Sequence, residues 1–266
     1  MPTPVPAESA GVVPDVAFKK AQVVNGALFE AKRVAGTVQV KFSKLSKGFV
    51  GVSATATLLS TGKKVSAKVV KVPLSGDNTL SGTLVFKAPI GDLAFSVDES
   101  GEFRLGSDLY SMSAADMTKL PSGKFILDSG FALDVPGELL TDLLPMDVDF
   151  SVSGSKWTFA KNASVKWAKP KNGAPPPEMF DKESGKGLVV DTSKGKTNLS
   201  ALKLTYKAKD GTFKGSFKVY ALEGEGAKMK LKKYTVNVAG IVVDGVGYGR
   251  ATCKKPAAGP WSVVVQ

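Results

Sequence analysis

The chain has 266 residues, enough for one large or two ordinary domains, and its 43% hydrophobic and 23% charged content is typical of a folded globular protein. It contains no histidine, which excludes Ser-His-Asp triads, Cys-His pairs and histidine-ligated zinc. The net charge of +12 comes almost wholly from lysine, whereas specific phosphate and base recognition favours arginine. We therefore expect a lysine-rich solvent surface and no specific nucleic-acid binding.

The first 20 residues are rich in proline and small side chains, and they lack the charged and apolar regions of a signal peptide. We expect a flexible leader at 1–20. No apolar run along the chain approaches the roughly 20 residues that a transmembrane helix needs, so no transmembrane segment is expected. The single cysteine, Cys253, lies in a strand-like stretch and is expected to be buried, with a free reactive thiol or an intermolecular bridge as the alternatives.

Apolar and polar residues alternate along most of the chain, which predicts β-strands. In residues 36–43, Val38, Val40 and Phe42 share one face and polar side chains share the other. Residues 202–222 show the same pattern on two strands, with lysines on the polar face and Asp210-Gly211 as the hairpin turn. The lysines are therefore expected to form the solvent face of a half-buried antiparallel sheet.

Two short stretches favour helices instead. Residues 107–120 begin with a serine and an aspartate, either of which could cap a short helix, and residues 136–144 begin at a proline. The segment 88–150 also carries twelve acids against three basic residues, a charge of 3 − 12 = −9. All other segments are predicted to be strands and turns, so the fold class is all-β with at most one or two short helices.

An internal repeat is indicated by glycines that recur without a gap at an offset of 164 residues, since each marks a turn or a close backbone approach. The recurring pairs are Gly51 and Gly215, Gly62 and Gly226, and Gly76 and Gly240.

The repeat predicts two tandem antiparallel β-barrel-like modules, since closure of a sheet hides its edge strands. The first module is expected at 21–168, with the acid-rich segment as an insertion, and the second at 188–266. Residues 169–187 between them are rich in proline, glycine and lysine and are expected to be a linker.

Three tryptophans are the candidate ligand-binding residues. A hairpin turn centred on Asn162 would pair Trp157 with Trp167 on one sheet face, and such a pair could stack on a sugar ring. The alternative is that this face is core, because cross-strand aromatic pairs commonly stabilise sheets. Trp261 is the third candidate for a carbohydrate platform.

Other motifs carry less weight. The acid pairs Asp98/Glu99 and Asp147/Asp149 lack any supporting signature for glycoside hydrolysis or calcium binding. The glycine-rich residues 244–253 continue into a strand-like stretch and not into a helix, so a packed strand is favoured over a phosphate loop. We expect no catalytic residues, no metal and no cofactor.

Residues 198–220 (NLSALKLTYKAKDGTFKGSFKVY) and 234–256 (YTVNVAGIVVDGVGYGRATCKKP) resemble an uncharacterised repeated β-module found near the C-termini of large secreted bacterial surface proteins. The resemblance extends loosely to residues 153–171 and 35–44. It implies a secreted or cell-surface location and an accessory or structural role, and it assigns no catalytic residue.

The expected function is that of a non-enzymatic extracellular module with a structural, adhesive or assembly role on a bacterial surface. Its expected partners are other copies of the chain or neighbouring surface proteins. The alternative is a carbohydrate-binding module that uses exposed tryptophans, with a polysaccharide as the partner. An enzyme that acts through carboxylates or lysine is a third hypothesis.

Overall fold

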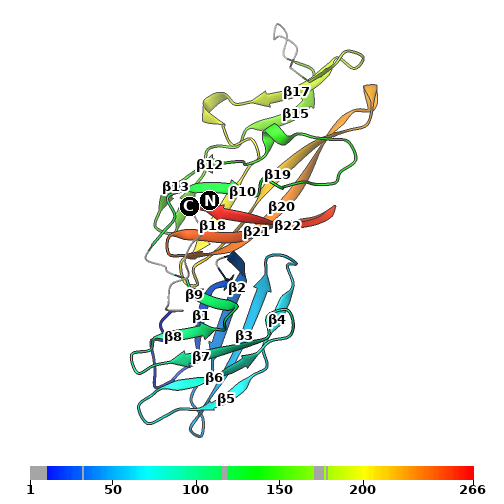
Figure 1. Ribbon diagram of the computed structural model, residues 1–266. Helices are drawn as coiled ribbons and strands as arrows, with labels where there is room; N and C mark the ends of the chain where they lie inside the picture. Colours follow the sequence, from blue (N-terminus) through cyan, green and yellow to red (C-terminus); the bar gives the residue numbers. More distant parts are fainter. Residues whose placement is uncertain (1–10, 32, 116–118, 171–176, 178) are drawn as a thin grey trace. The chain divides into compact units, whose positions relative to one another are not determined.

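The computed structural model describes residues 11–31, 33–115, 119–170, 177 and 179–266. These residues form strands and short 3-10 helices, and no α-helix occurs among them. The prediction of an all-β fold with two β-barrel-like modules is confirmed, because the strands form two large curled sheets (Figure 1).

Neither predicted helix is an α-helix. Residues 107–120 contain strand β9 (Tyr110–Ala114), whose Tyr110 and Met112 alternate into the core, while residues 116–118 lie outside the described part of the chain. Residues 136–144 contain strand β11 (Glu138–Leu139) and the single-turn 3-10 helix η1 (Thr141–Leu143). The period-two burial of β9 outweighs the helix signal.

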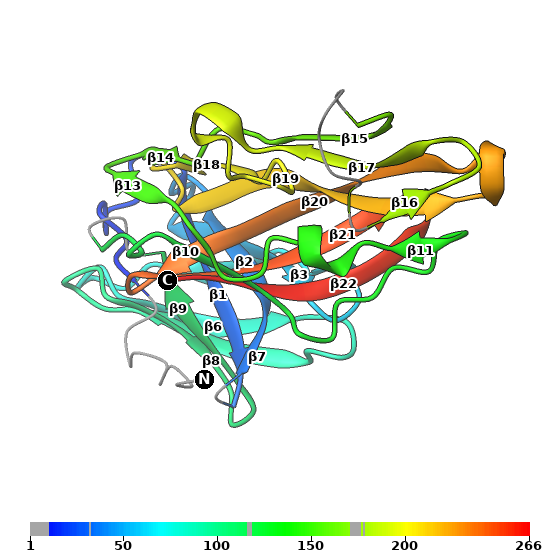
Figure 2. The ribbon, with the colours of Figure 1, turned by 90° about the horizontal axis from the view of Figure 1, so that it is seen from above.

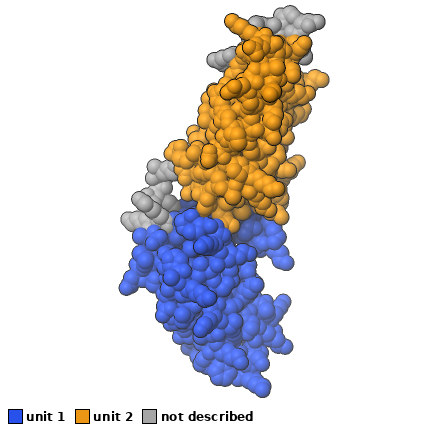
Figure 3. Space-filling view, turned by 90° about the vertical axis from the view of Figure 1, so that its right-hand side faces the viewer, with its two compact units in different colours: residues 1–121, 207–213, 240–249 blue, residues 122–206, 214–239, 250–266 orange. Residues whose placement is uncertain are grey.

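Close packing divides the chain into two compact units, coloured separately in Figure 3. Unit 1 comprises residues 1–121, 207–213 and 240–249, and unit 2 comprises residues 122–206, 214–239 and 250–266. These boundaries differ from those of the modules predicted from the sequence. The predicted linker falls within unit 2, where residues on either side of it pair as strands, and its residues 171–176 and 178 lie outside the described part.

Unit 1 is built on a nine-stranded antiparallel sheet with the strand order β4-β3-β2-β1-β9-β8-β7-β6, and β5 also pairs with β3. Its other strands are β1 (Gln22–Glu30), β2 (Arg33–Phe42), β3 (Phe49–Leu58), β4 (Lys64–Ser66), β5 (Val70–Pro73), β6 (Leu80–Val85), β7 (Asp92–Val97) and β8 (Phe103–Gly106). A bridge between Ala67 and Phe86 joins the two ends of this sheet, and Lys68 N donates to Val85 O at 3.4 Å. The sheet therefore curls around one apolar core.

The core of unit 1 follows the predicted alternation. Val38, Val40 and Phe42 are buried, and the rings of Phe18 and Phe103 lie 5.7 and 5.4 Å from that of Phe42. The opposite face of β1 is covered as well, because a second cluster joins Ala27 and Phe29 to Ile241, Val243 and Tyr248. The last three residues belong to unit 1 although they are distant in sequence.

Unit 2 is built on an eight-stranded sheet with the strand order β11-β19-β20-β21-β22-β10-β12, and β18 also pairs with β19. Its strands are β10 (Lys124–Leu127), β12 (Val148–Asp149), β18 (Lys203–Lys207), β19 (Thr212–Glu223), β20 (Lys230–Val243), β21 (Val246–Lys254) and β22 (Ala257–Val265), together with β11. The 3-10 helices η2 (Ser193–Gly195) and η3 (Gly226–Lys228) lie in connections. Strands β19, β20 and β21 each also contribute residues to unit 1.

Two small sheets complete unit 2. One pairs β13 (Ser151–Ser153) with β14 (Lys156–Thr158), and the other has the order β15-β17-β16, with bounds Ser164–Ala168, Lys186–Asp191 and Phe180–Asp181. The three-stranded sheet lies over β19 and β20 (Figure 2), where Val165 packs with Tyr220 and Leu222. This small sheet covers β19 near Tyr220 and Leu222. It does not cover the part of β18 and β19 where Lys203 and Lys214 are exposed.

The two expected copies of the repeat share strand order but not the ungapped register. Strands β2 and β3 are followed by the positive-φ glycine Gly62, as β18 and β19 are followed by Gly226. An offset of 164, however, aligns the buried Val50 with the exposed Lys214 (214 − 50). Because a slip of one residue inverts the faces of a strand, an offset of 163 aligns buried residues with buried residues. The aligned pairs are Val50 and Phe213, Ala54 and Phe217, and Ala56 and Val219.

Candidate functional site

The predicted hairpin of residues 202–222 is present in the structure. Leu202, Leu204 and Tyr206 are buried, and β18 pairs with β19 across a turn in which Gly211 has a φ of +66°. Within the turn, Asp210 N donates to Lys207 O at 3.2 Å. The polar side of this hairpin therefore faces solvent, as the alternation predicts.

We define the lysine face as the exposed polar surface of β18, β19 and β20 that carries Lys203, Lys214, Lys218, Thr205, Ser216 and Thr235. Lys203 and Lys214 are exposed, and Lys218 is half-buried with its Nζ donating to Thr235 Oγ1 at 2.6 Å. The strands are tightly apposed there, because a Cβ on Gly215 would lie 1.9 Å from Lys203 O. Lysines and short hydroxyl side chains thus alternate on this side of the hairpin.

The charges of this face are not neutralised within the described part of the chain. None of the three lysines takes part in an ion pair there, whereas Lys207, nearer the turn, pairs with Asp210. Cations held on neighbouring strands repel one another, and a bound anion would relieve that repulsion. The lysine face is therefore a candidate surface for an anionic partner.

Unit 2 also carries a surplus of the opposite sign. The acidic segment, defined as residues 128–149, has six carboxylates and no basic residue. Asp134, Glu138, Asp142, Asp147 and Asp149 are exposed. Among the described residues, only Asp147 of this segment forms an ion pair, with Lys124 Nζ at 3.5 Å. The same unit thus exposes both a basic and an acidic surface.

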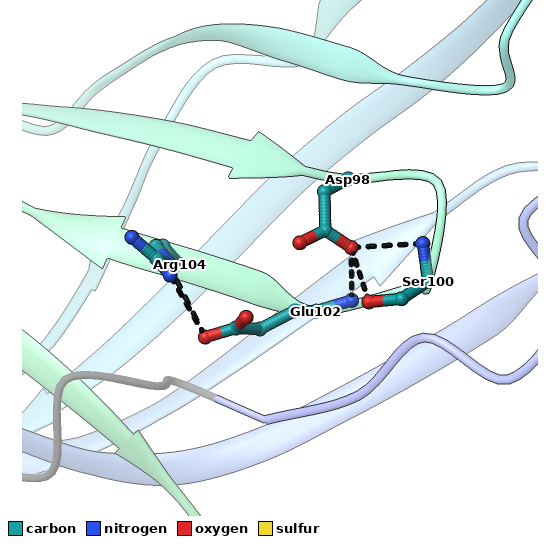
Figure 4. Close-up of polar contacts among 4 residues, drawn as sticks. All are labelled: Asp98, Ser100, Glu102 and Arg104. Atoms are coloured by element: carbon teal, nitrogen blue, oxygen red, sulfur yellow. Dashed lines mark hydrogen bonds and ion pairs between the residues drawn. The ribbon is translucent and has the colours of Figure 1, made fainter.

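Figure 4 shows that the Asp98 side chain stabilises the turn between β7 and β8. Asp98 Oδ1 accepts hydrogen bonds from Ser100 N at 3.0 Å, Ser100 Oγ at 2.6 Å and Glu102 N at 2.9 Å, and Arg104 pairs with Glu102. The bond from Ser100 Oγ is the largest factor that lowers the pKa of Asp98. A general acid needs the opposite shift, so this arrangement supports a turn and not proton donation.

Aspartate side chains stabilise other turns in the same way. Backbone N–H groups two residues further on donate to Asp77, Asp128, Asp191 and Asp210, and Asp181 accepts from Glu183 and Ser184. Hydrogen bonds from Ser75, Ser184 and Lys196 are the chief causes that lower the pKa of Asp77, Asp181 and Asp191 respectively. At Asp210 burial opposes the shift, but bonds from Lys207 and Thr212 outweigh it and lower the pKa.

These turns predict acid sensitivity. A carboxyl whose pKa is lower in the folded than in the unfolded chain contributes stability above its unfolded pKa of about 4, and that contribution is lost as the pH falls through the folded value. We expect the urea midpoint to fall steadily from about pH 4 downwards. Asp98→Asn keeps the acceptor oxygen and should flatten part of this pH dependence. A midpoint that does not change between neutral and acidic pH would contradict the assignment.

The structure contradicts the predicted pairing of Trp157 with Trp167. Trp157 lies on β14 opposite Val152, whereas Trp167 lies on β15 opposite Leu188. The segment between them does not form a tight turn, because Asn162 bridges Asn198 in parallel, with Ala163 N donating to Asn198 O at 3.0 Å. A contact with a residue 36 positions away thus replaces the local hairpin.

Each tryptophan has its own packing. Trp157 is 7% exposed and stacks on Tyr206 with an interplanar angle of 4°. Trp167 is partly buried beside the cluster of Tyr220 and Leu222. Trp261 is partly exposed on β22, its ring centroid lies 4.4 Å from that of Phe131, and a Cβ on Gly259 would approach its ring to 3.0 Å. The structure brings no two of them together.

The remaining motifs have structural roles. Residues 246–254 form strand β21, as expected for the glycine-rich stretch, and Cys253 is buried as predicted. Asn198 is 4% exposed, its Oδ1 accepts from Leu202 N and its Nδ2 donates to Leu202 O, each at 2.8 Å. An amide held in this way serves as a backbone partner.

The lysine face, the turn-stabilising aspartates and the dispersed tryptophans describe the candidate surfaces of the chain. No protein-family model, curated protein or solved structure matches the chain. Among the described residues, no helix has the length and apolar character needed to cross a membrane.

Proposed function

We propose that the chain is a non-enzymatic extracellular module with a structural, adhesive or assembly role on a bacterial surface. The observation that carries this proposal is the uncompensated lysine face of β18–β20, which lies on the same unit as the exposed acidic segment 128–149. A surface of one sign on one copy can bind the surface of opposite sign on another copy or on a neighbouring protein. Complementary potentials of this kind steer encounter and set orientation.

Association between unlike surfaces has a geometric consequence. A contact between two different patches is head-to-tail, and it forms rings or open filaments according to whether its rotation closes. The chain or a protein that contains it would then form a lattice or fibre. This fits the secreted, cell-surface setting that the resemblance implies.

The test replaces Lys203, Lys214 and Lys218 with glutamine and compares association with the wild type by sedimentation velocity at low and high salt. We expect wild-type oligomers at low salt that dissociate at high salt, and a monomeric variant under both conditions. The matched control replaces Lys156, Lys161 and Lys182, which are also exposed lysines of unit 2. Equal association of all three proteins, or none by the wild type at low salt, would refute the assembly role.

Carbohydrate binding is the alternative, and the partly exposed Trp261 with Phe131 beside it is the observation that favours it. Flat aromatic rings match the C–H face of a pyranose. Calorimetric titration of the protein with soluble polysaccharides should then detect binding, and Trp261→Ala should abolish it. Retention of binding in Trp261→Ala would exclude this platform.

A further inference from the structure

A second basic surface lies on unit 1 and differs from the lysine face in being partly apolar. Residues 31–76 contain nine lysine or arginine residues and no acid. They supply β2 to β5, which pair with one another at one end of the sheet. Among the described lysines of this stretch none forms an ion pair. These strands therefore carry a surplus of positive charge.

Large apolar side chains are exposed within this positive region. Phe49 is 46% exposed and Val69 is 68% exposed. They lie close together, because Gly51, two residues after Phe49 on the same strand face, would place a Cβ 3.7 Å from Val69 Cγ1. The absence of a side chain at Gly51 leaves room for Val69 over the strand. Val85 is 49% exposed at the end of β6, and its carbonyl oxygen accepts a hydrogen bond from Lys68 N.

Lysines surround these apolar residues on several sides. Lys47 precedes Phe49 in a turn, with φ values of +52° at Lys47 and +78° at Gly48, and Lys71 pairs with Gly51 across the strands. Lys68 is adjacent to Val69 in sequence. All three lysines are exposed. We name the surface of Phe49, Val69, Val85, Lys47, Lys68 and Lys71 the basic-apolar patch.

We propose that the basic-apolar patch binds the surface of an anionic lipid bilayer. Peripheral binding to a bilayer is stable when two weak signals combine, namely apolar side chains that enter the interface and cations that attract acidic headgroups. The patch supplies both within a few residues. A soluble polyanion would engage the lysines but would gain nothing from Phe49 or Val69, so the apolar residues favour a bilayer as the partner.

The test measures co-sedimentation of the full chain with vesicles of phosphatidylcholine alone and of phosphatidylcholine mixed with phosphatidylglycerol. We expect binding to the mixed vesicles only, reversed by high salt. The triple variant Lys47→Gln, Lys68→Gln and Lys71→Gln should lower the partition coefficient at least about tenfold, since each cation near an anionic surface contributes several-fold. Phe49→Ser with Val69→Ser should also lower it several-fold without any change of charge.

Matched controls replace the exposed Leu109 and Met146 with serine and the exposed Lys156, Lys161 and Lys182 with glutamine, and these should bind as the wild type does. Thermal melting of each variant confirms that it is folded. Two results would overturn the proposal: no binding of the wild type to the mixed vesicles at low salt, or binding that is unchanged in the folded Phe49→Ser, Val69→Ser variant. The second result would assign the patch to polyanions in general.

Discussion

Replacing Phe217 with alanine is expected to lower the free energy of unfolding by about 3–5 kcal/mol, the usual cost of deleting a buried aromatic ring. Phe217 is fully buried, and its ring centroid lies 6.2 Å from that of Phe125 and 5.9 Å from that of Phe131. The deletion removes these ring contacts and leaves a cavity, because strands paired on both sides cannot close around it.

Urea denaturation followed by circular dichroism measures this effect as a lower midpoint with an unchanged slope. Met146→Ala is the matched control, since Met146 is 44% exposed in the same unit, and it should change the free energy by less than about 0.5 kcal/mol. Equal midpoints for the two variants would show that Phe217 does not lie in the core of unit 2.

Gly215→Ala is expected to destabilise the fold by about 1–3 kcal/mol or more, although it adds only one methyl group. The new Cβ would lie 1.9 Å from Lys203 O and 2.8 Å from the carbon of the same carbonyl. Both atoms belong to the backbone of a paired strand, so β18 must move away from β19 to accept them. Such a movement weakens the hydrogen bonds of the hairpin that carries the lysine face.

The glycine repeat supplies the controls for this experiment. Gly51 and Gly76 recur in the sequence as Gly215 and Gly240, but the three atoms nearest to a Cβ on Gly51 would be side-chain atoms of Ser43 and Val69 at 3.2 to 3.7 Å, and a Cβ on Gly76 would meet nothing within 4 Å. Gly51→Ala and Gly76→Ala should therefore be tolerated, whereas Gly240→Ala should be costly because of Phe213 and Tyr248 O. Equal effects at Gly51 and Gly215 would contradict the structure.

Local alternation was sufficient to predict the strands that face solvent on one side. The inward positions of 38–42 and of 202–219 follow from side-chain period alone, because a half-buried strand exposes every second residue. The lysine face could be predicted for the same reason. The absence of ion pairs on the lysine face could not be predicted, because the pairing of distant strands determines which carboxylates lie near these lysines.

Long-range pairing explains what the sequence could not predict. The expected tryptophan hairpin fails because Asn162 meets Asn198, and no local pattern encodes a contact over 36 residues. Tyr110 and Met112 suit a helix or a strand by composition, and only the pairing of β9 with β1 decides between them. The basic-apolar patch was not predicted, because it forms where the connection between β4 and β5 brings Val69 beside Gly51 of β3.

Strands β19, β20 and β21 each divide their residues between the two units, and neither unit is a continuous piece of chain. Unfolding of unit 1 would therefore release Ile241, Val243 and Tyr248 from their cluster with Phe29 and loosen strands on which unit 2 is built. We therefore expect these shared strands to couple the stability of the two units, so that thermal melting shows a single cooperative transition.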